Sequence, residues 1–294
     1  MSIRRDKLQS LLGIDVRELK KEDLITSSRE LLESGMHGVC FSPYEGSQRP
    51  GDPISEEQIR HKLELLRPYT EWIRTFSCTE QNEMIPKLAK EYGFKTLVGA
   101  WLGEDLEKNE EELQGLINLC NSEMVDIAAV GNEVMYREEL SEDKLIDYIH
   151  RVKYEIKRIP IGYVDAYYEF TDHPKIAEAC DVILANCYPY WEGCSIDYSL
   201  IYMKQMYQQA QRAATGKPVI ITETGWPSEG ESLGAAVPGY KNALKYFIDA
   251  ISWSKKEEIP MFYFSSFDEP WKVSAEGSVG AFWGLWDQNH KLKF

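Results

Sequence analysis

Eight short apolar runs recur along the chain, each followed by a polar loop and a stretch with helical periodicity. They are GVCFSPY (38–44), WIRTFS (72–77), KTLVGAWLG (95–103), VDIAAVGNE (125–133), IGYVDAY (161–167), DVILANCYPY (181–190), PVIITETGW (218–226) and MFYFSSFDE (261–269). Their hydrophobicity is continuous rather than alternating, which is typical of strands buried on both faces of a parallel sheet. Successive runs begin about 32 residues apart, the length of one β-strand–α-helix unit. Eight such units predict an α/β fold, a single-domain (β/α)8 TIM barrel.

A doubly wound open sheet is the alternative architecture. It would place a glycine-rich turn after the first strand, whereas residues 43–53 read PYEGSQRPGDP. The barrel is therefore favoured, and we assign it to residues 36–294. Residues 1–35 precede the first strand, and segments 5–12 and 22–32 have helical patterns. We expect them to form a helical extension packed on the barrel.

The charge balance narrows the class of partner. The formal net charge is −15 and no basic stripe is present, which argues against nucleic acid and against an anionic membrane surface. A neutral substrate is the natural partner. No apolar run reaches the roughly 18 residues of a membrane-spanning helix, and the first residues lack the pattern of an export signal. A cytoplasmic location is therefore expected unless a signal has been removed, and a monomer is expected.

The cysteines and histidines show no pattern of a metal centre. The six cysteines form no C-x-x-C pair, and the five histidines are scattered. We expect buried, reduced thiols, because free cysteine behaves as a small apolar residue. Neither a metal nor a cofactor is expected.

Two acids directly follow apolar strands. The fourth run ends in VGNE, whose last residue is Glu133, and the apolar part of the seventh run ends in ITE, whose last residue is Glu223. In TIM barrels the reacting groups gather at the C-terminal ends of the strands, so both side chains are expected at one mouth. A carboxylate there is costly to bury unless it is paired or reactive. Glycoside cleavage needs such a pair, one acid to protonate the leaving oxygen and one to attack the anomeric carbon or activate water.

Other strand ends supply candidate binding groups. Trp226 and Trp271 are expected to stack on sugar rings, because flat apolar rings suit the C–H faces of pyranoses. Trp283 and Trp286 are expected to pack in the core. Further candidates for binding substrate hydroxyls, with a lysine as local counter-charge, are Tyr44, Asp165, Asp268, Glu269 and Lys272.

The segments GVCFSPY, IRTFSC, VGNE, CYPYWEG, ITETGWPS, FDEPWK and GAFWGLWD together resemble family 17 glycoside hydrolases, the β-1,3-glucanase family. They span residues 38–287 in family order, and ITETGWPS and FDEPWK are the most specific. By this resemblance Glu133 is the acid/base and Glu223 the nucleophile of a retaining mechanism. Asn132 then binds the sugar 2-hydroxyl, Tyr188 lies near Glu223, and Arg74 is a cationic neighbour.

The resemblance implies a β-1,3-glucan or laminari-oligosaccharide substrate and a covalent glycosyl-enzyme intermediate. A hydrolase is the first expectation. A β-1,3-glucanosyltransferase using the same site, a non-catalytic glucan-binding barrel and a different β-glycosidic linkage are the alternatives. Because no long cleft-building insertion is evident, endo and exo action stay open.

Overall fold

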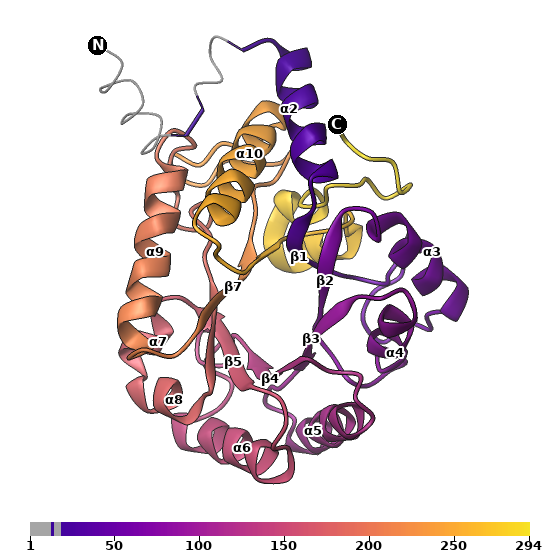
Figure 1. Cartoon of the computed structure of the whole chain (residues 1–294), viewed down its shortest axis with the longest axis vertical. Coiled ribbons are helices and arrows are strands. Elements are labelled where there is room, and N and C mark those ends of the chain that lie inside the picture. The colour runs from indigo at the N-terminus through magenta and orange to yellow at the C-terminus, as the bar shows by residue number, and fades with distance from the viewer. Residues whose placement is uncertain (1–12, 15–18) are drawn as a thin grey trace.

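The computed structural model describes residues 13–14 and 19–294. Eight parallel strands pair in sequence order and the eighth pairs with the first, which closes a barrel (Figure 1). The predicted (β/α)8 fold is confirmed. The strands are β1 (Met36–Cys40), β2 (Thr70–Thr75), β3 (Lys95–Ala100), β4 (Ile127–Asn132), β5 (Ile161–Ala166), β6 (Val182–Asn186), β7 (Val219–Thr224) and β8 (Met261–Tyr263).

Helices form the outer layer, because strands buried on both faces need an apolar cover. The longer ones are α2 (Lys21–Glu33), α3 (Glu56–Leu66), α4 (Met84–Glu91), α5 (Leu106–Asn121), α6 (Glu142–Glu155), α9 (Ser199–Ala213) and α10 (Tyr240–Lys256). Shorter segments are α7 (Glu169–Asp172), α8 (Pro174–Ala179), η1 (Pro270–Lys272), α11 (Val273–Glu276) and η2 (Gly277–Ala281). Local sequence sets their starts: Ser55 accepts a hydrogen bond from the backbone N–H of Gln58, whose side chain accepts one from Ser55 N–H.

The helix expected near residues 22–32 corresponds to α2, which lies beside α10 (Figure 1). The helical pattern at 5–12 lies outside the described residues. A buried ion pair on α10, with 2.7 Å between Lys245 Nζ and Asp249 Oδ2, holds the chain before α2. Its lysine donates to the carbonyl of Ile14, and its carboxylate accepts from Ile14 N–H at 2.8 Å.

The strand pairing is regular at the N-terminal ends of the strands and becomes irregular near the C-terminal ends of three of them. Its register shifts between Ala129 and Asn132 of β4, and between Ala185 and Asn186 of β6. A third shift separates Ile221 from Thr224 on β7. Such irregularities re-aim side chains and concentrate next to functional sites. All three occur at the mouth where the candidate acids were expected.

Candidate active site

Glu223 lies near the end of β7 and is only 6% exposed. The guanidinium of Arg74, which comes from β2, donates through Nη1 to its Oε1 at 2.6 Å. The hydroxyl of Tyr188 donates to Oε2 at 2.8 Å. Each carboxylate oxygen thus accepts a hydrogen bond from a buried side chain, and the bond from Arg74 is charge-assisted.

Arg74 also joins the two acid-bearing strands. Its Nη2 donates to Oδ1 of Asn132 at 2.6 Å, and Asn132 directly precedes Glu133. Burial and the charge of Glu223 raise the pKa of Tyr188 well above its ordinary value, so its phenol remains a donor. The predicted neighbours Arg74, Asn132 and Tyr188 are therefore brought together around Glu223.

Glu133 follows β4 in a different environment. Its backbone has a φ of 54°, in the left-handed region that non-glycine residues seldom adopt and that concentrates at functional sites. Asn186 of β6 donates from Nδ2 to its Oε1 at 2.8 Å. Burial, and next the charge of Glu223, raise the pKa of Glu133 to about 7, while the Asn186 hydrogen bond opposes this rise. The two acids are thus close enough to influence each other, and Glu133 is protonated at mildly acidic pH.

The loop after Glu133 is fixed by buried polar contacts. Asp165 is fully buried and accepts hydrogen bonds from the Tyr163 hydroxyl and from backbone N–H groups, including that of Met135 at 3.2 Å. The prediction that Asp165 binds substrate is therefore wrong, because its carboxylate is enclosed and its acceptors are occupied. Its contacts hold the turn that carries Glu133.

Two further predicted contacts are also corrected. Trp226 is 1% exposed, and its indole Nε1 donates to the carbonyl of Val237 at 3.0 Å, so its ring packs in the core and offers no face to a sugar. Asp268 accepts from Lys293 Nζ at 2.7 Å and from Gly284 N–H at 2.9 Å. These bonds tie the loop after β8 to the C-terminal segment, and Asp268 borders a cavity that neither Glu133 nor Glu223 lines.

The other candidates that follow the eighth strand, Glu269, Trp271 and Lys272, lie close to one another in the sequence and make contacts near the end of that strand. Lys272 pairs with Glu269 at 2.8 Å and lies 4.1 Å from the centre of the Phe264 ring. Lys272 is therefore the counter-charge of Glu269 but not of Asp268. Trp271 meets Tyr44 edge-on, with 5.9 Å between ring centres, and its buried Nε1 has no hydrogen-bond partner among the described residues.

Two tryptophans at strand ends are exposed. Trp101 and Trp191 are each 40% exposed. The guanidinium of Arg137 lies 4.6 Å from the ring centre of Trp101, and Trp283 lies 5.5 Å from Trp191 with the rings tilted by 39°. Each exposed ring therefore rests on a fixed support. Trp283 and Trp286 themselves are buried, as expected for core packing.

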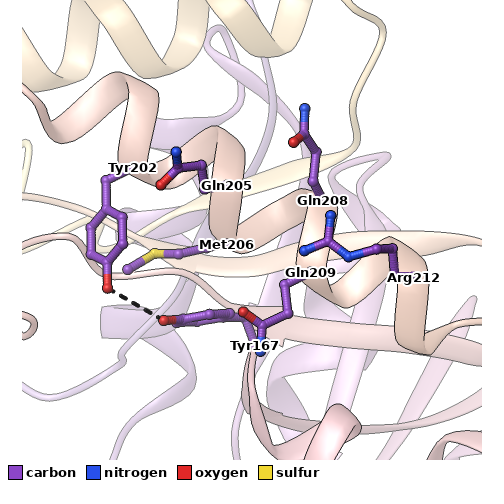
Figure 2. Close-up of a pocket in the computed structure, with 7 residues that line it drawn as sticks. All are labelled: Tyr167, Tyr202, Gln205, Met206, Gln208, Gln209 and Arg212. Carbon is purple, nitrogen blue, oxygen red and sulfur yellow. Dashed lines mark hydrogen bonds between the residues drawn. The ribbon is translucent and has the colours of Figure 1, made fainter.

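Two cavities lie away from the candidate acids. One of about 470 Å³ lies between Tyr167 and one face of α9, and Figure 2 shows the tyrosine hydroxyls of Tyr167 and Tyr202 meeting across it. The other, of about 580 Å³, is bordered by Asp268 and the C-terminal segment. Neither Glu133 nor Glu223 lines either cavity.

Among the described residues no group of three His, Cys, Asp or Glu side chains is placed to hold a metal ion. In the same part of the chain, no helix has the length and apolar character needed to cross a membrane. All six cysteines are free, and five are buried.

Sequence reasoning missed two residues that fix Glu133. Asn186 was visible only as a polar residue inside an apolar run. Arg137 follows Glu133 and donates to the carbonyls of Asn132 and of Leu102, at 2.9 Å for the latter. The sequence marks both as polar groups near strand ends but does not show which way they point.

The closed barrel, with one hydrogen-bonded carboxylate and one carboxyl of raised pKa at its C-terminal mouth, defines the class of barrel glycosidases. Residues 38–284 match the BtgE/BtgC glycoside hydrolase domain. The chain belongs to this family, within glycoside hydrolase family 17, and is a glycosidase.

Relatives of known name agree with this assignment. The chain is 30% identical to the glucan 1,3-beta-glucosidase BGL2 of Candida albicans over 79% of its own length and 83% of that protein. It is similar to the family 17 β-1,3-glucanosyltransferase from Rhizomucor miehei, with a TM-score of 0.79, 29% identity and coverage of 89% and 96% of the two chains. An endo-laminarinase from Formosa shares the fold alone, with a TM-score of 0.77, 19% identity and coverage of 93% and 87%.

Proposed function

We propose that this glycosidase cleaves β-1,3-glucan or laminari-oligosaccharides with retention, using Glu223 as nucleophile and Glu133 as acid/base. The observation that carries the proposal is the unequal environment of the two acids. Arg74 donates to one oxygen of Glu223 and Tyr188 donates to the other, while burial raises the pKa of Glu133 to about 7. Acids whose environments differ in this way divide the roles of nucleophile and proton donor.

The reaction follows from these two states. A carboxylate oxygen of Glu223 bonds to the anomeric carbon as the bond to the leaving oxygen breaks, and that oxygen takes the proton of Glu133. A covalent glycosyl-enzyme ester results. Glu133, now ionised, removes a proton from water, whose oxygen attacks the anomeric carbon and releases Glu223. Two inversions give net retention. For this mechanism the two carboxyl groups are expected about 5–5.5 Å apart.

Asn132 is suited to hold the sugar beside Glu223. Its Oδ1 accepts from Arg74, which fixes the amide so that its N–H groups point away from the guanidinium. We propose that they bind the 2-hydroxyl, a contact that strengthens in the transition state.

Aromatic groups around the mouth fit a neutral sugar chain. Trp101 and Trp191 present exposed rings, and Trp271 has a buried N–H that a substrate hydroxyl can satisfy. Tyr44 stands edge-on to Trp271, and Glu269 with Lys272 supplies further polar contacts. The substrate class is supported by the glucan-active names of the relatives.

A glucanosyltransferase is the second candidate, favoured by the similarity to the Rhizomucor miehei enzyme of that name. Both reactions share the covalent intermediate, and the acceptor, water or sugar, separates them. Incubation with laminari-oligosaccharides of defined length tests the choice. Shorter products alone indicate hydrolysis, products longer than the substrate indicate transfer, and no products that depend on Glu133 and Glu223 would contradict both.

A further inference from the structure

Asn186 joins the two acid-bearing strands on the side away from Arg74. It ends β6 and is 3% exposed. Its Nδ2 donates to Glu133 Oε1 at 2.8 Å, and its Oδ1 accepts from the hydroxyl of Thr222 at 2.9 Å. Thr222 is fully buried on β7 and directly precedes Glu223. A continuous hydrogen-bonded path therefore runs from the nucleophile strand to the other acid.

The irregular sheet creates this path. Pairing between β6 and β7 passes from Ala185 opposite Ile221 to Asn186 opposite Glu223, so Thr222 is bypassed. Two residues on one strand then face one residue on the other, which turns side chains out of the regular alternation. The shift explains how Thr222 and Asn186 meet at the mouth.

We propose that Asn186, oriented by Thr222, is a positioning residue that keeps Oε1 of Glu133 as an acceptor and so places its acid proton on Oε2. This inference rests on the proposed role of Glu133. A protonated carboxyl has one hydroxyl oxygen and one carbonyl oxygen. An amide N–H directed at Oε1 favours the carbonyl there, which leaves Oε2–H to meet the leaving oxygen.

Thr222 contacts the oxygen end of the Asn186 amide, opposite the end that faces Glu133. Its hydroxyl hydrogen satisfies Oδ1 of Asn186, and the NH2 end points to the carboxyl. A reversed amide would present an oxygen to Glu133 in place of the N–H donor. That orientation would stabilise a proton on Oε1, the wrong oxygen for catalysis.

With the Arg74 contacts, two paths link the acids. One runs from Glu223 through Arg74 to Asn132, beside Glu133. The other runs from Thr222, beside Glu223, through Asn186 to Glu133. Their positions on β2 and β6 restrain the acid separation from two sides, and a small misplacement of reacting groups is costly in rate.

The charged groups that face Glu133 predict how its titration responds. Glu223 and Asp165 raise its pKa, whereas Arg137 and the Asn186 hydrogen bond lower it. Removing the donor therefore raises the pKa of Glu133 further. The basic limb of kcat/KM, which requires protonated Glu133, is expected to move to higher pH.

The test compares Asn186→Ala and Thr222→Val with a matched control, Thr224→Val. Thr224 is also buried on β7, but its hydroxyl contacts Cys187 and Tyr246 rather than an acid. Activity is measured on laminari-oligosaccharides and on a 2,4-dinitrophenyl glucoside, whose leaving group needs no proton. Each variant is also checked for folding by circular dichroism.

For Asn186→Ala we expect kcat on the oligosaccharide to fall by about 10- to 100-fold, a part of the range for general acid catalysis, with little change in KM. The basic limb of its kcat/KM profile should shift to higher pH, and the rate at which the activated substrate forms the glycosyl-enzyme should be little changed. Thr222→Val should change in the same direction but less, and Thr224→Val should keep the wild-type pH profile.

An unshifted basic limb in both folded variants, or equal losses on both substrates, would overturn the proposal. If Asn186→Ala does not fold, Thr222→Val alone decides by the same criteria. Glu133→Gln separates the two levels of inference. If it retains full oligosaccharide activity, the proposed function fails. If it is inactive while the Asn186 and Thr222 variants behave like wild type, only the positioning role fails.

Discussion

Arg74 and Glu223 form a buried ion pair across the barrel mouth, with 2.6 Å between Nη1 and Oε1. The guanidinium comes from β2 and the carboxylate from β7. Arg74 also holds Asn132, so one cation organises three strand ends. A planar guanidinium can serve both partners at once, whereas a lysine ammonium lacks its fixed fork of donors.

Replacing Arg74 should therefore damage both stability and catalysis. Arg74→Met leaves the carboxylate of Glu223 buried without its cation, a change that typically costs about 3–5 kcal/mol. Arg74→Lys keeps the charge and should lose less stability while still lowering kcat, because Asn132 is no longer held. Urea unfolding and steady-state kinetics measure the two effects. Unchanged kcat in the lysine variant would contradict the bridging role.

The raised pKa of Glu133 predicts a cost in stability at alkaline pH. Above the ordinary value of 4.5 the unfolded chain releases this proton first, so the folded state loses relative stability until pH passes about 7. Glu133→Gln removes this penalty. The free energy of unfolding should rise by at most about 3 kcal/mol at pH 8 and change little at pH 4.

Glu138→Gln provides the control for this experiment, because Glu138 is exposed on the same loop. Its stability difference from wild type should not increase from pH 4 to pH 8. Equal effects of Glu133→Gln at both pH values would show that the charge of Glu133 carries no burial penalty.

Activity should depend on the same proton. In the proposed mechanism Glu133 enters the reaction protonated, so kcat/KM is expected to decline as pH rises through about 7. The pH profile of kcat/KM on a laminari-oligosaccharide measures this limb. A plateau extending two units above pH 7 would mean that another group donates the proton.

The tryptophans divide into structural and binding groups. Trp226→Ala should lower the free energy of unfolding by about 3–5 kcal/mol, the usual cost of truncating a buried aromatic ring. Trp101→Ala, at an exposed ring, should mainly raise KM and leave stability within about 0.5 kcal/mol. Thermal unfolding and kinetics distinguish the two. The reverse pattern would restore the stacking role first predicted for Trp226.

The sequence predicts features that depend on position along a strand. Continuous apolar runs identify all eight strands, and the location of Glu133 and Glu223 at strand ends follows from barrel topology. Arg74, Asn132 and Tyr188 are found for the same reason. The family resemblance placed Tyr188 and Arg74 near Glu223, but it did not predict the hydrogen bond from Arg74 to Asn132.

The predictions for Trp226 and Asp268 were wrong because the position of a residue along a strand does not by itself set the direction of its side chain. Trp226 follows β7 but turns into the core, where it contacts Tyr190 and Tyr246. Asp268 is hydrogen-bonded to Lys293 of the C-terminal segment. No local sequence pattern predicts that this segment returns to the end of β8. Asn186 was missed because its orientation depends on a register shift between β6 and β7. Such shifts arise from tertiary packing and are invisible to periodicity.

The assignment of nucleophile and acid/base is tested most directly by azide rescue of two variants, read by the stereochemistry of the product. Glu133→Ala should still form the glycosyl-enzyme from a 2,4-dinitrophenyl glucoside, and azide should then restore turnover and give the β-glycosyl azide. Glu223→Gly cannot form the intermediate, so azide should attack directly and give the inverted α-glycosyl azide. A β-azide from the Glu223 variant, or no azide product from either folded variant, would contradict the assignment.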